Sequence, residues 1–185
     1  MVRRSTRRDG AVRRRGQALP EFALVLPVLA LIFLSIIQIA FIFAAQVGIT
    51  NAVREAARLA AVTTPTTTSG QASTNGAGVL SALTNGTTGY LKRNVFAYSA
   101  ANLSSGAGAT QVCYESFTDS AGNPAVKVKV DATYRHSLFI PLIGAILDGI
   151  DGTSGDGFRV SASEEMRVEN DGQASLAAFG PTCAF

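Results

Sequence analysis

An apolar run from Phe22 to Val47 constrains this chain more than any other feature. Its 26 residues include no charged side chain. The residues that interrupt its apolar character are Pro27, Ser35, Gln38 and Gln46. At about 1.5 Å per residue the run makes a helix of roughly 39 Å, longer than the ~30 Å hydrocarbon core of a bilayer. A cleaved secretory signal has an apolar region of only ~7–15 residues, so the run predicts a membrane-spanning helix that is retained.

The charges on either side of the run predict its orientation. Residues 1–16 carry seven arginines and one acid, whereas residues 49–185 carry nine basic and eleven acidic side chains. Because Lys and Arg are enriched in cytoplasmic flanks, residues 1–16 are predicted to be a basic cytoplasmic leader and the C-terminal part to be exported. No aromatic residue is interleaved with the arginines, so the basic arm indicates topology rather than nucleic-acid binding.

A single carboxylate, Glu21, stands at the entrance of the run, where it complements the positive end of the helix dipole. A cut after Gly16 would make Gln17 the first residue, Glu21 the fifth and Phe22 the sixth. This spacing resembles the processing site of type IV pilin-like proteins, which a prepilin peptidase cuts on the cytoplasmic side of the helix. In that family the fifth-position Glu can pair with the new N-terminal amine of a neighbouring subunit. The resemblance therefore implies processing at Gly16–Gln17 and subunit packing through Glu21 and Phe22.

Three segments resemble one family within this group. Residues 16–27 (GQALPEFALVLP) are similar to the opening of TadE-like proteins, pseudopilins of the tight-adherence (Flp) pilus machinery. Residues 50–62 (TNAVREAARLAAV) and 161–169 (SASEEMRVE) are similar to later parts of that family. The resemblance implies a single-pass inner (cytoplasmic) membrane protein that assists pilus assembly without being an enzyme. Its implied partners are the membrane, a prepilin peptidase, other pilin-like subunits and pilus assembly components.

Beyond the run, helix propensity and spacing predict that the helix continues over residues 49–62. Small residues recur there on one face, at Ala52, Ala56 and Ala60. Such a face suits either close approach of a neighbouring helix or packing on the sheet of the same chain. Residues 63–110 are rich in Thr, Ser and Gly and are predicted to be a linker with short elements.

Period-two alternation predicts antiparallel strands in the remainder of the chain. The clearest strand covers residues 126–135, and two others cover 111–117 and 158–168. We therefore expect an α+β fold: a long N-terminal transmembrane helix that continues outside the membrane and packs on a small antiparallel sheet of about three strands. The predicted parts are a leader (1–16), a transmembrane helix (17–48), a helix extension (49–62), a linker (63–110) and an exported sheet region (111–185).

Cys113 and Cys183 are the only cysteines, and both lie on the predicted exported side. An even pair in an oxidising compartment favours a disulfide, which here would close a loop of about 70 residues. Unpaired thiols or a link to another subunit are the alternatives.

Other polar residues give weaker signals. His136, the sole histidine, is expected on the surface at a strand end, and no nucleophile motif supports a catalytic role for it. Asp148, Asp151 and Asp156 lie in a Gly-rich stretch that fails the EF-hand spacing, so a solvated turn is expected. No metal, cofactor or small-molecule substrate is predicted.

The apolar segment from Ser137 to Leu147 is too short to span a bilayer. It is predicted to cap the sheet as core, or else to dock on the membrane or a partner. Two other functions stay open for the whole chain. One is a signal-anchored exported binding or adhesion protein that no prepilin peptidase processes, and the other is a membrane-tethered enzyme.

Overall fold

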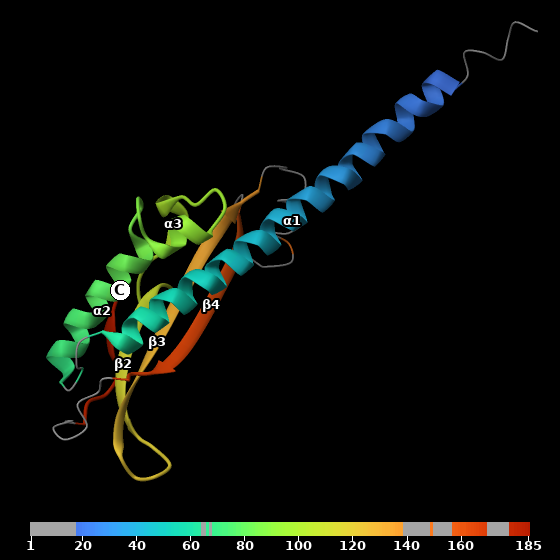
Figure 1. Cartoon of the computed structure of the whole chain (residues 1–185). Coiled ribbons are helices and arrows are strands. Elements are labelled where there is room, and N and C mark those ends of the chain that lie inside the picture. Colours follow the sequence, from blue (N-terminus) through green and yellow to red (C-terminus); the bar gives the residue numbers. More distant parts are fainter. Residues whose placement is uncertain (1–17, 64–65, 67, 139–148, 150–156, 170–177) are drawn as a thin grey trace, which may run out of the picture. The chain divides into compact units, whose positions relative to one another are not determined.

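The computed structural model describes residues 18–63, 66, 68–138, 149, 157–169 and 178–185. The chain divides into two compact units, residues 1–37 and residues 38–185. Helix α1 (Ala18–Val62) begins in the first unit and ends in the second, which holds all the other elements (Figure 1). The predicted α+β fold, with a long apolar N-terminal helix and an antiparallel sheet, is confirmed.

The sheet is antiparallel throughout and is organised around one long strand, β3 (Pro124–Ser137). Strand β4 (Gly157–Arg167) pairs with one edge of β3, and β2 (Gln111–Thr118) pairs with the other. These three strands agree with the three expected from the sequence. Two short strands were not anticipated: β1 (Leu103–Ser104), which pairs with β3, and β5 (Thr182–Ala184), which pairs with β2.

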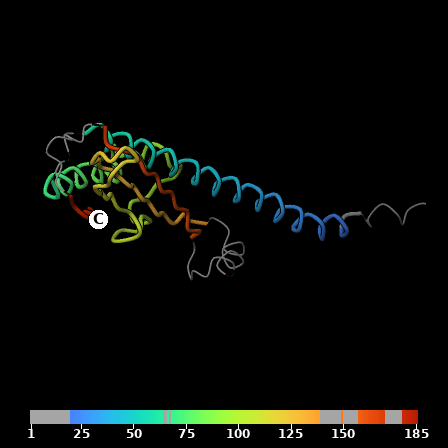
Figure 2. The backbone as a smooth tube through the Cα atoms, turned by 90° about the horizontal axis from the view of Figure 1, so that it is seen from below, coloured from blue at the N-terminus to red at the C-terminus, as the bar shows by residue number. Residues whose placement is uncertain are grey.

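One face of the sheet is covered by the second-unit part of α1 (Figures 1 and 2). The inward-facing residues of β3 alternate as predicted and are almost fully buried. They are Val126, Val128, Val130, Ala132 and Tyr134. From α1, the small residues Ala52, Ala56 and Ala60 are fully buried in the same apolar cluster. The Tyr114 hydroxyl of β2 also donates a hydrogen bond to the Ala60 carbonyl oxygen, over 3.1 Å. The small face of α1 therefore packs on the sheet of its own chain.

Residues 63–110, predicted to be a linker with short elements, contain more helix than expected. They include α2 (Ser69–Thr84), α3 (Tyr90–Asn94) and a 3₁₀ turn, η1 (Ala100–Asn102). The side chain of Thr68 caps α2 by accepting a hydrogen bond from the Gln71 amide. The buried stripe of α2 consists of Ala72, Gly76, Val79 and Leu83. Two of these four residues are small, so the stripe carried little apolar signal in the sequence.

The small residues of α2 serve a close approach to the sheet. A Cβ atom added to Gly76 would lie 3.3 Å from both the Ala184 Cβ of β5 and the Val112 carbonyl oxygen of β2. Both are tight contacts, so a larger residue would force the helix away from the sheet. The small residues that made this segment resemble a linker are therefore the residues that allow α2 to pack tightly on the sheet.

Helix α1 also comes very close to the end of α3, at Gly48. A Cβ atom added there would lie 2.4 Å from the backbone carbonyl oxygen of Asn94. Gly48 is buried, and its neighbour Ile49 is fully buried. The absence of a side chain at residue 48 thus lets the two helices touch.

We predict that Gly48→Ala destabilises the second unit by about 1–3 kcal/mol, the usual cost of overpacking. The matched control is Gly78→Ala in α2, where an added Cβ has nothing within 4 Å. Because alanine has the higher helix propensity, that change should stabilise by about 0.5–1 kcal/mol. Denaturant unfolding of both variants in detergent measures the two effects. Equal changes of the same sign in the free energy of unfolding of both variants would contradict the close contact between Gly48 and Asn94.

Candidate membrane-anchoring segment

The exposure of α1 changes abruptly at Gln38. From Pro20 to Ile37 nearly every side chain is exposed on all sides of the helix, and most are large and apolar. From Gln38 onward one face is buried, with a spacing of three or four residues. The buried positions include Gln38, Ile42, Ala45, Ile49, Ala52, Ala56 and Ala60. A helix that is apolar on every side needs an apolar environment, and no described residue of this chain covers residues 20–37.

The polar side chains within the run have defined surroundings. The Ser35 hydroxyl donates to the Leu31 carbonyl oxygen of the same helix, over 2.7 Å. Gln46 donates from Nε2 to the Ser161 carbonyl oxygen of β4, over 2.9 Å. Gln38 is buried, with 2% of its surface exposed. The Ser35 hydroxyl and the Gln46 amide are thus directed to protein, as an apolar environment requires.

Length and composition mark α1 as able to cross a membrane, and no other helix in the described part of the chain has this property. Counted from Phe22, about 20 residues at 1.5 Å each span the ~30 Å hydrocarbon core and end at Phe41. Burial of one face of α1 begins at Gln38 and continues at Ile42. The apolar stretch and the packed stretch therefore overlap by about one turn of the helix.

At the N-terminal end, Glu21 lies in the first turn of α1 and is exposed, as is Phe22. Glu21 has no ion pair or hydrogen bond with any residue that the structure describes. Its carboxylate is thus open to a partner from outside the described chain. Gly16 and Gln17, the predicted processing site, lie outside the described residues.

Residues 16–58 match the family model described as TadE-like protein. Over this segment the chain is similar to TadE-like proteins. The match includes Gly16, Glu21, Phe22 and α1 as far as Arg58, and it supports a role in tight-adherence pilus assembly. It does not reach the sheet, including the segment 161–169. No match was found among curated proteins or among solved structures.

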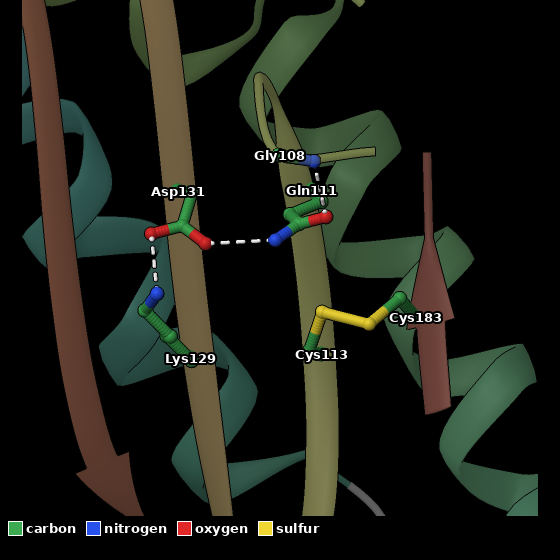
Figure 3. Close-up of polar contacts among 6 residues, drawn as sticks. All are labelled: Gly108, Gln111, Cys113, Lys129, Asp131 and Cys183. Atoms are coloured by element: carbon green, nitrogen blue, oxygen red, sulfur yellow. Dashed lines mark hydrogen bonds and ion pairs between the residues drawn. A yellow bond between two sulfur atoms is a disulfide. The ribbon is translucent and has the colours of Figure 1, made fainter. Parts of the chain in front are cut away.

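On the outer face of the sheet, Cys113 of β2 and Cys183 of β5 are joined by a disulfide (Figure 3). The two residues are direct cross-strand partners and are 70 positions apart in the sequence. Closing a loop of that length is worth roughly 4 kcal/mol in the chain-entropy model. The disulfide therefore holds the three-residue β5, and with it the C-terminus, on the edge of the sheet.

Beside the disulfide, Asp131 of β3 accepts a hydrogen bond from Gln111 and pairs with Lys129, whose Nζ is 3.3 Å away (Figure 3). Partial burial raises the pKa of Asp131, but hydrogen bonds from Ser163 and Gln111 and the charge of Lys129 outweigh it, so the net pKa is lowered. These side chains satisfy one another. Within the described residues no cluster of His, Cys, Asp and Glu is arranged to hold a metal ion.

The sequence suggested that His136 lies on the surface, but the structure shows that it is buried. Only 2% of it is exposed, and neither ring nitrogen has a hydrogen-bond partner among the described residues. The alternation that buries Val126 through Tyr134 continues for two more residues and brings His136 to the inner face. That continuation was visible in the sequence. Asp148, Asp151, Asp156 and most of the apolar segment after Ser137 lie outside the described residues.

Burial lowers the pKa of His136, because the charged imidazolium is poorly solvated inside the protein. Below the ordinary histidine pKa of about 6.5 the unfolded chain then binds a proton that the folded chain does not. We therefore predict that the free energy of unfolding decreases as the pH falls from about 6.5 toward the lowered folded pKa.

The control is His136→Leu, which removes the only histidine of the chain. Denaturant unfolding between pH 7 and pH 5 should show a weaker pH dependence in this variant than in the wild type. The same slope in both proteins would show that His136 does not titrate in this way.

Proposed function

We propose that this chain is a membrane-anchored, non-enzymatic, pilin-like component of tight-adherence pilus assembly. The observation that carries the proposal is the two-part α1, whose first part is apolar on every side and whose second part is packed on a sheet. The TadE-like match covers both parts of this helix, up to residue 58. One continuous helix thus joins a membrane anchor to a folded domain.

The second unit is proposed to lie on the exported side of the inner membrane. The seven arginines before the run favour a cytoplasmic N-terminus. The Cys113–Cys183 disulfide supports the same orientation, since disulfides persist in oxidising compartments and are rare in the cytosol. These two arguments rest on different residues at opposite ends of the chain.

In this proposal a prepilin peptidase cuts after Gly16 and leaves Glu21 as the fifth residue. An ionised carboxylate near the hydrocarbon core is costly unless it has a partner. Because Glu21 has none among the described residues, the new N-terminal amine of a neighbouring subunit would satisfy it. Glu21 then directs lateral packing of helices, with Phe22 beside it as an apolar contact.

A signal-anchored binding or adhesion protein is the second candidate, because the exposed helix by itself requires only an anchor. It differs from the first in needing neither a cut after Gly16 nor a partner for Glu21. Enzymatic activity is not proposed, since the polar clusters of the described residues are surface ion pairs and hydrogen bonds.

We predict that Glu21→Ala leaves membrane insertion unchanged and strongly reduces piliation, because the apolar run is intact and only the proposed pairing is lost. Membrane fractionation and pilus counts by electron microscopy, in cells that express the protein at wild-type level, measure the two effects. Glu165→Ala, which removes an exposed carboxylate of β4, serves as the control and should leave both unchanged.

Wild-type pilus numbers in Glu21→Ala would exclude the packing role and favour the signal-anchored alternative. Loss of the protein from the membrane fraction would instead show that Glu21 acts in insertion.

A further inference from the structure

An exposed aromatic side chain lies beside α1 where the apolar stretch meets the packed stretch. Phe96, just after α3, stacks on Phe41 with ring centroids 5.3 Å apart and ring planes nearly parallel, yet 55% of it is exposed. The next residue, Ala97, has a φ of +53°, an unfavourable conformation for a residue other than glycine. The turn that exposes Phe96 therefore includes an energetically unfavourable backbone conformation.

The position of Phe96 along the helix axis is informative. Phe41 is the residue at which a ~30 Å hydrocarbon core, counted from Phe22, ends. A phenylalanine stacked on it lies at the boundary between acyl chains and headgroups. Aromatic side chains on the apolar face of interfacial segments occupy this depth in membranes. Exposure of the Phe96 ring is unfavourable in water but favourable at this boundary.

Two arginines lie at the corresponding end of the sheet. Arg135 of β3 and Arg159 of β4 are direct cross-strand partners on the outer face. Neither forms an ion pair with a described residue. Like charges directly opposite each other destabilise a sheet, so their juxtaposition indicates an anionic partner outside the described residues.

The hydrogen bond from Gln46 to Ser161 places these arginines along α1. Strand β4 and α1 run in the same direction, since Arg54 pairs with Glu164 further along both elements. Arg159 precedes Ser161 by two residues, or about 7 Å of strand. The same distance back along α1 from Gln46 is four to five residues, which leads to Phe41–Ile42. The arginines and Phe96 thus lie at one level.

A shallow hollow of about 340 Å³ opens beside Arg135. Asn102 and Ser137 line it, and the Asn102 amide donates to the Ser137 hydroxyl oxygen over 2.9 Å, which leaves the hydroxyl proton available to a ligand. The Arg135 side chain passes close to Gly157: a Cβ atom added to Gly157 would lie 3.6 Å from the Arg135 Nε. A guanidinium and a hydroxyl donor around a small hollow suit a phosphate group.

We propose that Phe96, Arg135 and Arg159 form a docking edge that seats the second unit on the surface of an anionic bilayer. Phe96 enters the interface, and the two guanidinium groups bind lipid phosphates. The inference rests on the proposed membrane anchoring by α1. It assigns a second, independent membrane contact to the folded domain.

The chain contains no tryptophan, so single tryptophans can report membrane depth. We would reconstitute Phe96→Trp, Leu31→Trp and Val62→Trp in bilayers that contain anionic lipids brominated on the acyl chains. Leu31 lies in the exposed apolar stretch, and Val62 is exposed at the other end of α1, roughly 32 Å beyond Phe41. The lipid should quench Leu31→Trp and Phe96→Trp strongly and Val62→Trp severalfold less.

The docking edge would be overturned, and the anchor left in place, if Leu31→Trp were quenched but Phe96→Trp were quenched no more than Val62→Trp. Absence of quenching in Leu31→Trp would overturn both. As a readout without an aromatic substitution, hydrogen exchange of the wild-type amides at residues 96–99 should slow when anionic lipid replaces zwitterionic lipid.

The arginines are tested by combining Arg135→Gln and Arg159→Gln with Phe96→Trp. In the parent, quenching should be greater in anionic than in zwitterionic bilayers, and the double change should abolish this difference. Arg58→Gln, which removes an exposed charge near the other end of α1, should leave the difference intact. A lipid-charge effect that survives the double change, or that is absent from the parent, would contradict phosphate binding.

Discussion

The packing of α1 on the inner face of β3 is the contact on which the rest of the structure depends. Ala52, Ala56 and Ala60 give the helix a flat surface, and the valines of β3 fill the space opposite. This contact holds the last part of α1 in the second unit, while the first part remains uncovered by any described residue. The packing thus makes the last part of α1 an integral element of the second unit.

The same packing decides between two uses of the small-residue face. In an assembly of pilin-like subunits, alanines at this spacing would suit contact between helices of different chains. Here they are fully buried within their own chain, so contacts between subunits must use other surfaces. The exposed apolar stretch before Gln38 offers such a surface, and Glu21 lies at its start. The proposed lateral assembly through this stretch would leave the second unit free to contact other partners or the bilayer.

Much of this fold was predictable from the sequence because long periodic signals specify it. The apolar run predicted the long helix α1, and the alternation in residues 126–135 predicted β3. The α2 helix was missed because its buried stripe uses Ala72 and Gly76, small residues that also characterise linkers. His136 was misplaced because its residue type outweighed its position in the alternation. The stacking of Phe96 on Phe41 and the pairing of Arg135 with Arg159 depend on tertiary contacts between distant segments, which periodicity does not report.

The most direct test of the account is the N-terminal residue of the protein extracted from membranes, in cells with and without a functional prepilin peptidase. We expect the chain to begin at Gln17 when the peptidase is present and to keep the preceding arginine-rich leader when it is absent. That result would establish the chain as a processed, pilin-like subunit. An unprocessed leader in both strains would contradict this account and leave a signal-anchored protein with the same fold.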